Sequence, residues 1–233
     1  MEFNADKDVG WSWYNFTVMS IMSIIMIFVV ILLSMTVHEA MHAFMGYILG
    51  DNTAKEEGRL TLNPVKHIDP VMTILLPLIM VILHAPVFGG AKPVPFNPSK
   101  VRFGDWGAAL VSLSGPITNL IIAFIVFGVG VFGGVINNSG VVQPTIFGLI
   151  ISTAVSVNLG FFVFNMLPIP PLDGSRILYA VAPNSVRSVM QKIEQNGILL
   201  VMIIVVLFSD VIGQVMSGCI QAILRAFMNI FSV

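Results

Sequence analysis

An apolar stretch near the N-terminus contains the motif that most constrains this chain. No charged residue occurs at 10–36, and apolar residues resume at 43–49. Between these two runs lies H-E-x-x-H, which places His38 and His42 four residues apart and Glu39 beside the first. On a helix the two histidines share one face. Two imidazoles at this spacing can bind one zinc ion, and Glu39 can act as a general base toward water.

Composition indicates that this motif lies in a membrane. Of the 233 residues, 56% are hydrophobic and only 10% are charged, with a mean hydropathy of +0.93, whereas soluble domains carry about 25% charged residues. Ionisable residues are energetically costly in a bilayer. A functional role for the motif is therefore favoured over the alternative that the two histidines are simply buried and hydrogen-bonded within a helix bundle. The net charge of −1 gives no indication of nucleic-acid binding. The single cysteine, Cys219, excludes a disulfide framework and a cysteine-based zinc site.

Long apolar segments predict an all-α polytopic membrane protein. Three spans are expected at about 16–49, 108–132 and 146–166, and they form a three-helix catalytic core. The first would be roughly 50 Å long as one helix, so it must tilt, protrude or be enclosed by protein in a bilayer core of about 30 Å. The apolar region 198–231 predicts one or two C-terminal helices.

Two shorter features complete the expected fold. Residues 71–83 are apolar, but they are few for a span and include Pro77, so we expect a re-entrant segment. Residues 59–62 could form a short β-strand, and the proline-rich stretch 89–98 predicts an extended loop.

The distribution of basic residues predicts the topology. Lysines and arginines occur in 50–69, 84–105 and 167–197, whereas loop 133–145 contains none. If 71–83 is re-entrant, all three basic segments lie on one side, and the positive-inside rule makes that side cytoplasmic. The end of the H-E-x-x-H helix then faces the cytoplasm.

Three parts of the chain follow from this topology. Residues 1–15 form an extracytoplasmic N-terminus, 16–182 the intramembrane core, and 183–233 the C-terminal membrane segment or segments. The acidic N-terminus lacks the basic region of a cleaved signal peptide, so we expect the first span to be retained. The number of spans after residue 197 and the oligomeric state stay open.

A zinc hydrolase needs a third protein ligand and leaves a fourth position for water. The acids and histidines in or beside apolar segments are His84, Asp173 and Asp210. Asp173 is favoured, because it follows the third span on the side of the motif and its proline-rich approach can turn back toward the membrane. Its carboxylate could also cap the helix that follows.

Further side chains could assist the reaction. Asn165 and Asn119 lie near apolar helices and could donate to a developing oxyanion, although both could equally join helices by hydrogen bonds. Lys92, Pro93 and Val94 lie in the extended loop, which is either a connector or an edge that binds an unwound substrate by strand addition. Local unwinding is needed because a helix hides its peptide bonds.

Together these motifs resemble the site-2 proteases, the zinc intramembrane metalloproteases of peptidase family M50, in their compact prokaryotic form without PDZ or CBS domains. The matching stretches, in the family's order, are 38–42, 58–64, 67–70, 90–95, 114–119, 165–168 and 171–174. The resemblance implies one zinc per chain held by His38, His42 and Asp173, with Glu39 as catalytic base. It implies that Asn165 steadies the substrate or oxyanion.

The resemblance also implies a biological role. We expect an intramembrane endopeptidase of the prokaryotic cell (inner) membrane that cuts transmembrane segments of other proteins, either in regulated proteolysis or in clearing signal-peptide remnants. Its partners are then a transmembrane substrate and the lipid bilayer. One alternative is a non-enzymatic metal carrier, but a carrier would line the whole bilayer with ionisable residues. The second alternative is a catalytically inactive homologue that acts as a binding partner, and the intact Glu39 argues against it.

Overall fold

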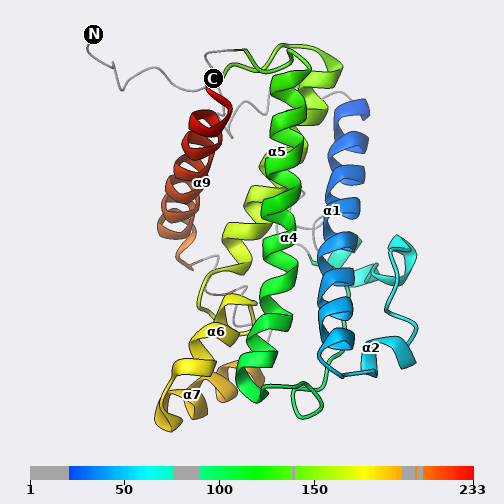
Figure 1. Ribbon diagram of the computed structural model, residues 1–233, viewed down its shortest axis with the longest axis vertical. Coiled ribbons are helices and arrows are strands. Elements are labelled where there is room, and N and C mark those ends of the chain that lie inside the picture. Colours follow the sequence, from blue (N-terminus) through cyan, green and yellow to red (C-terminus); the bar gives the residue numbers. More distant parts are fainter. Residues whose placement is uncertain (1–20, 76–89, 138–139, 196–202, 204–206) are drawn as a thin grey trace.

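The structure, a computed structural model, describes residues 21–75, 90–137, 140–195, 203 and 207–233 of the chain (Figure 1). Its elements are α1 (Ile21–Ile48), α2 (Thr53–Glu56), η1 (Pro64–Lys66), η2 (Pro70–Leu75), α4 (Gly104–Phe132), α5 (Ile146–Asn165), α6 (Gly174–Val181), α7 (Asn184–Gln195) and α9 (Ser209–Phe231). Among the described residues, four helices are long and apolar enough to cross a membrane, namely α1 from residue 24, α4, α5 and α9. The expected all-helical membrane protein is confirmed at this level.

The apolar segments expected from the sequence are helical where the structure describes them. Helix α4 begins four residues before the predicted segment 108–132 and continues through Pro116. Helix α5 covers the segment predicted at 146–166 except for its last residue. The start of the re-entrant segment is a π-helical turn, η2. The remainder of that segment, the N-terminus and most of 196–206 lie outside the described residues.

The short β-strand predicted at 59–62 is wrong. The chain turns there instead: the Arg59 N–H donates to the Ala54 carbonyl, and the Thr61 N–H donates to the Arg59 carbonyl. The Arg59 side chain is buried and donates to the Lys92 carbonyl at 2.5 Å, so it holds this turn against the extended loop. Among the described residues, β-pairing is limited to the isolated bridge between Ile136 and Val142.

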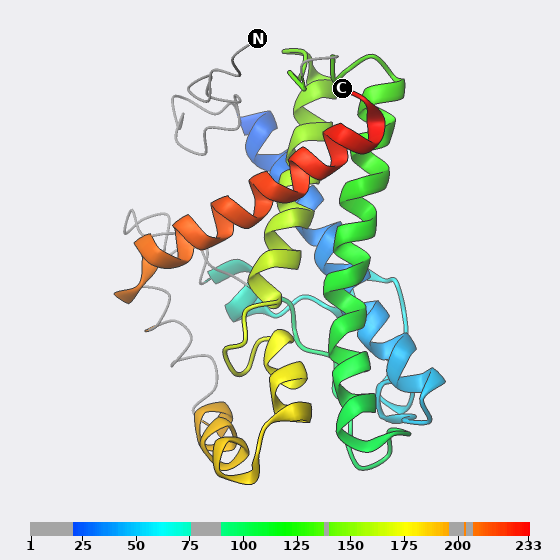
Figure 2. The same cartoon turned by 60° about the vertical axis from the view of Figure 1, so that its left-hand side comes forward.

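Helices α1, α4 and α5 pack together, and α9 leans across the α4–α5 pair (Figures 1 and 2). The faces of α4 toward its neighbours are rich in small residues, which allow close backbone approach in a membrane. A larger apolar core joins α4, α5 and α9, and Phe127, Leu159 and Leu224 lie in it. Helices α2, α6 and α7 gather at one end of the bundle, opposite loop 133–145.

Asp51 ties the end of α1 to the extended loop. Its side chain is only 2% exposed and accepts hydrogen bonds from the Thr53 N–H at 3.0 Å, the Thr53 hydroxyl at 2.5 Å and the Asn97 N–H at 2.6 Å. Burial by itself raises the pKa of Asp51, but these bonds and the charge of Lys100 outweigh it. The pKa therefore lies below the ordinary value of 3.8.

We therefore predict that Asp51→Ala lowers the stability of the protein in detergent by about 2 kcal/mol, because three donors lose a buried acceptor. Since the folded-state pKa is lowered, the stabilisation is complete above the ordinary pKa and is lost as the pH falls through the lowered value. Thermal unfolding at neutral pH measures the effect, with the exposed neighbour Glu57→Ala as control. Equal unfolding temperatures for the two variants would contradict this role of Asp51.

Candidate metal centre

Two histidines of α1 face α4 one helical turn apart. The His38 and His42 rings meet edge to face with centroids 4.6 Å apart, and their Nε2 atoms are 3.0 Å apart. The i, i+4 spacing of the motif produces this arrangement directly, as expected from the sequence.

Asp173 reaches the same point from a distant part of the chain. It directly precedes α6, and its Oδ2 lies 3.2 Å from Nε2 of His38 and 3.4 Å from Nε2 of His42. The carboxylate makes no capping hydrogen bond to α6, so it is directed at the histidines and not at its own helix. A side chain at Gly174 would meet the Met166 carbonyl oxygen at 2.3 Å, so glycine permits α6 to begin against the end of α5.

Hydrogen bonds indicate which nitrogen of each histidine carries the proton. Nδ1 of His42 lies 2.8 Å from the Val111 carbonyl oxygen, which can only accept, so Nδ1 donates and Nε2 keeps its lone pair. Nδ1 of His38 lies 2.5 Å from Oδ1 of Asn119. Nδ2 of Asn119 donates to Oδ1 of Asn158 at 2.8 Å, so the amide oxygen of Asn119 is the atom that faces His38. Because that oxygen can only accept, Nδ1 of His38 donates as well.

The donor set fits a zinc ion. Two imidazole lone pairs and a carboxylate oxygen face one another within 3.4 Å, an arrangement that a cation among them would stabilise. Two histidines and one carboxylate are ligands that zinc takes in hydrolases, and three protein ligands leave a position open.

Behind His38 a buried polar network connects three helices. Asn119 of α4 is 0% exposed and Asn158 of α5 is 1% exposed, and Nδ2 of Asn158 donates to the Ser34 hydroxyl of α1 at 2.9 Å. Sequence reasoning did not connect Asn158 and Ser34 to the candidate ligands. The available signal was an asparagine in the middle of an apolar span, where a polar side chain needs a partner.

Gly115 of α4 lies directly against the two histidines. A Cβ atom there would be 2.5 Å from Nε2 of His42 and 2.7 Å from Nε2 of His38. No side chain fits without displacing these ligand atoms. The glycine therefore leaves the space in which a metal would sit.

Glu39 points to the extended loop. Its Oε2 accepts a hydrogen bond of 2.9 Å from the N–H of Val94, and the side chain is half-buried. Val94 is buried, whereas Lys92 and Pro93 are exposed. Asn165, at the end of α5, donates from Nδ2 to the Phe161 carbonyl of its own helix at 3.0 Å.

The predicted site residues thus separate into two groups. His38, His42 and Asp173 come together as a possible metal site, and Asn119 contacts them through His38. Within the described part of the chain, Asn165 makes no hydrogen bond or ion pair with these ligands. The roles predicted for Asn165 in the reaction, and for Asn119, Lys92, Pro93 and Val94 in substrate binding, stay predictions. The alternative ligand His84 lies outside the described residues, and Asp210 is exposed in the first turn of α9.

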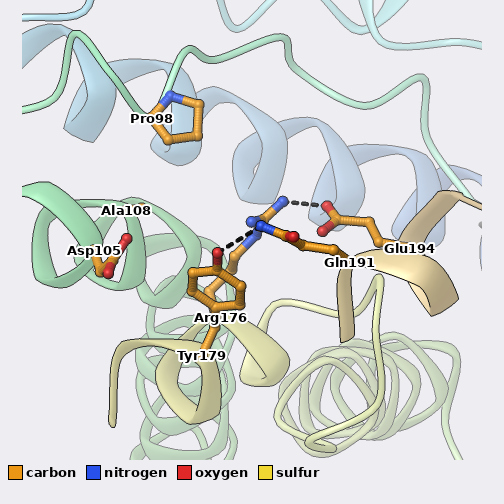
Figure 3. A pocket seen from close by; sticks show the side chains of 7 residues that line it. All are labelled: Pro98, Asp105, Ala108, Arg176, Tyr179, Gln191 and Glu194. Atoms are coloured by element: carbon orange, nitrogen blue, oxygen red, sulfur yellow. Dashed lines mark hydrogen bonds and ion pairs between the residues drawn. The ribbon is translucent and has the colours of Figure 1, made fainter. Parts of the chain in front are cut away.

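A cavity of about 240 Å³ lies elsewhere, where α4, α6 and α7 approach Pro98 (Figure 3). Its lining includes Arg176, which pairs with Glu194, and the Tyr179 hydroxyl, which accepts from Gln191. None of the predicted ligands lines it. The candidate metal centre is therefore defined by its converging side chains and not by this cavity.

Comparison with known proteins bears on what the site does. The model of the family "Peptidase family M50" matches residues 135–209, which include Asp173. "Putative zinc metalloprotease YwhC" of Bacillus subtilis is 40% identical over 209 residues, which cover 87% of this chain and 91% of that protein. "Putative zinc metalloprotease Rip2" of Mycolicibacterium smegmatis is 29% identical over 75% of this chain and 64% of its own length. No solved structure gives a significant match.

We predict that Gly115→Ala abolishes stoichiometric zinc binding, because the added methyl group would take the place of the ligand atoms. Metal analysis of the purified protein measures the result. Gly160→Ala in α5 is the matched control, since a Cβ there meets nothing within 4 Å. Full zinc occupancy in folded Gly115→Ala would show that the metal is held elsewhere.

We predict that Asn119→Ala weakens zinc binding by roughly 10- to 100-fold, the usual effect of losing a partner that orients a ligating histidine. Competition with a chelator of known affinity measures it. Thr118→Ala, which removes a hydroxyl that donates to the Ser114 carbonyl one turn back, is the neighbouring control. An unchanged zinc affinity in Asn119→Ala would remove Asn119 from this role.

Proposed function

The chain belongs to peptidase family M50 and is a zinc metalloprotease with transmembrane helices, and from this premise we propose that it is an intramembrane endopeptidase. Its substrates are transmembrane segments of other membrane proteins, or peptide bonds close to them, in regulated proteolysis or in clearance of signal-peptide remnants. One observation carries the proposal: the histidines that could hold the metal lie inside a candidate membrane span, residues 24–48, where they meet Asp173.

His38, His42 and Asp173 would hold one zinc ion per chain. The chemistry that zinc supplies in such a site is activation of water and polarisation of the peptide carbonyl. Asn119 and the Val111 carbonyl hold the two imidazoles with Nε2 free of protons, so the protein maintains the ligands in the state that binds metal.

Glu39 acts as the general base in this proposal. It follows His38 on α1 and is half-buried, and its Oε2 is occupied by the Val94 N–H. Its carboxylate accepts the proton of the attacking water and then delivers it to the leaving amine. Asn165 donates to the developing oxyanion, for which its amide must leave the Phe161 carbonyl.

The extended loop binds the unwound substrate as an added strand. The backbone N–H and C=O groups of Lys92 both bond to other parts of the protein. The N–H donates to the His67 carbonyl at 2.9 Å, and the carbonyl accepts from the Arg59 side chain at 2.5 Å. In extended backbone, alternate residues face opposite edges, so Pro93 and Pro95 belong to the other edge. Prolines have no N–H, so the substrate strand donates to their carbonyls at these positions.

The arrangement of charges supports the orientation proposed from the sequence. Helices α2, α6 and α7 lie at the end of the bundle where α1 ends and carry charged residues, whereas loop 133–145 at the other end has none (Figure 1). We place the end with α2, α6 and α7 in the cytoplasm, and the bacterial relatives support a location in the bacterial cell membrane. Residues 1–15 then face outward, 16–182 form the catalytic core, and 183–233 form the C-terminal membrane region.

A metal carrier is less consistent with these helices. The second half of α4 and the first half of α5 contain no ionisable residue, so no ligand path continues from the site through these parts of the bundle. A transport path through a bilayer needs such residues.

We predict that Glu39→Gln keeps one zinc per chain and lowers cleavage of a model transmembrane substrate by about 10²- to 10⁴-fold, the usual contribution of a general base. Cleavage in detergent is measured together with zinc content. Glu56→Gln, an exposed glutamate in α2, should behave as wild type. The proposal fails if Glu39→Gln and the wild type cut equally, or if zinc-loaded wild type cuts no transmembrane substrate.

A further inference from the structure

The hydrogen bond between Glu39 and the extended loop has a consequence for the reaction. We propose that the main-chain N–H of Val94 is a positioning group that holds the Glu39 carboxylate in place for proton transfer. The bond is 2.9 Å long and joins α1 to a segment 55 residues further along the chain. The inference rests on the proposed function, because it takes Glu39 as the base.

The Val94 N–H is a fixed donor because the loop is anchored on both sides of it. Before it, Lys92 is bound through its N–H and its carbonyl to His67 and Arg59. After it, the Asn97 N–H donates to Asp51 at 2.6 Å.

The Val94 side chain reinforces this anchoring. It is buried against Ala43 of α1 and Ala54 of α2. The residues on either side of Val94 are Pro93 and Pro95, which restrict the backbone further. The direction of the N–H group is therefore set by the fold and not by a mobile side chain.

A fixed donor to one carboxylate oxygen determines what the other oxygen can do. With Oε2 bound to Val94, the side chain of Glu39 loses rotational freedom, and Oε1 remains to accept a proton. Holding a base in one geometry before the reaction removes an entropic cost from the barrier. The same loop carries the edge proposed to bind substrate, so a shift of the loop would move the base.

Amide hydrogen exchange tests the contact without any activity measurement. In segment 90–97 the prolines have no amide, which leaves few exchanging groups to resolve: Gly90, Ala91, Lys92, Val94, Phe96 and Asn97. In Glu39→Ala the Val94 amide should exchange roughly 10-fold faster or more, because it loses a charged acceptor. The Lys92 and Asn97 amides keep their acceptors and serve as internal controls. Glu39→Gln retains an acceptor and should preserve most of the protection.

A proline substitution tests the functional consequence. Val94→Pro removes the N–H and exchanges the side chain for a ring at a position that already lies between two prolines, whereas Val94→Ala keeps the N–H and shortens the side chain. We expect Val94→Pro to retain zinc and to lower kcat by roughly 10- to 100-fold with little change in KM, as a misplaced base would. Val94→Ala keeps the N–H but loses part of the packing against Ala43 and Ala54, so it should lose clearly less kcat than Val94→Pro.

Each outcome decides the proposal. If zinc-loaded Val94→Pro has the kcat of Val94→Ala, or if Val94 exchanges equally fast in wild type and Glu39→Ala, the positioning role is overturned. If Val94→Pro fails to fold or loses zinc, the exchange comparison decides alone. A wild type without protease activity would overturn the proposed function while leaving the exchange result interpretable, so the two failures are distinguishable.

Discussion

The meeting of three electron-pair donors, Nε2 of His38, Nε2 of His42 and Oδ2 of Asp173, is the interaction on which the rest of this structure depends. Three such atoms within 3.4 Å repel one another unless positive charge lies among them. The fold nevertheless directs each of them inward, because the opposite side of each imidazole is tied to an acceptor on α4. The same contacts between α1 and α4 therefore pack the two helices and orient the candidate metal ligands.

Helix α4 can orient the ligands because it approaches α1 very closely. Gly115 provides the space, and Asn119, one turn further along, provides the acceptor that orients His38. An isolated amide in an apolar bundle would be costly, but Asn119 is satisfied by Asn158, which is in turn satisfied by Ser34 and its own helix. The polar network thus extends the site into α5, and it also holds three helices in one register.

The extended loop has a comparable organising role outside the helices. It is bound to Asp51, Arg59 and His67 on one side, and through Val94 it contacts Glu39. Its prolines leave it with carbonyl acceptors at alternate positions. In the proposed function one rigid segment would then face the catalytic base with one edge and the unwound substrate with the other, which links substrate binding to the geometry of proton transfer.

Local sequence patterns were sufficient for the helices of the bundle and for the histidine pair, because apolar length defines a span and the i, i+4 spacing of His38 and His42 is a property of any helix. Asp173 was favoured over His84 and Asp210 by its place after a span, but its meeting with the histidines is a tertiary contact. Local patterns were insufficient at 59–62, where a strand was predicted: the buried Arg59 and its bond to Lys92 determine a turn, and no local pattern reports a partner 33 residues away. The pairing of Asn158 with Ser34, the reason for glycine at 115, and the contact of Val94 with Glu39 were likewise decided by tertiary structure. Each depends on how closely two distant segments approach, and that distance is set by packing of the whole bundle and not by the residues next to them in the chain.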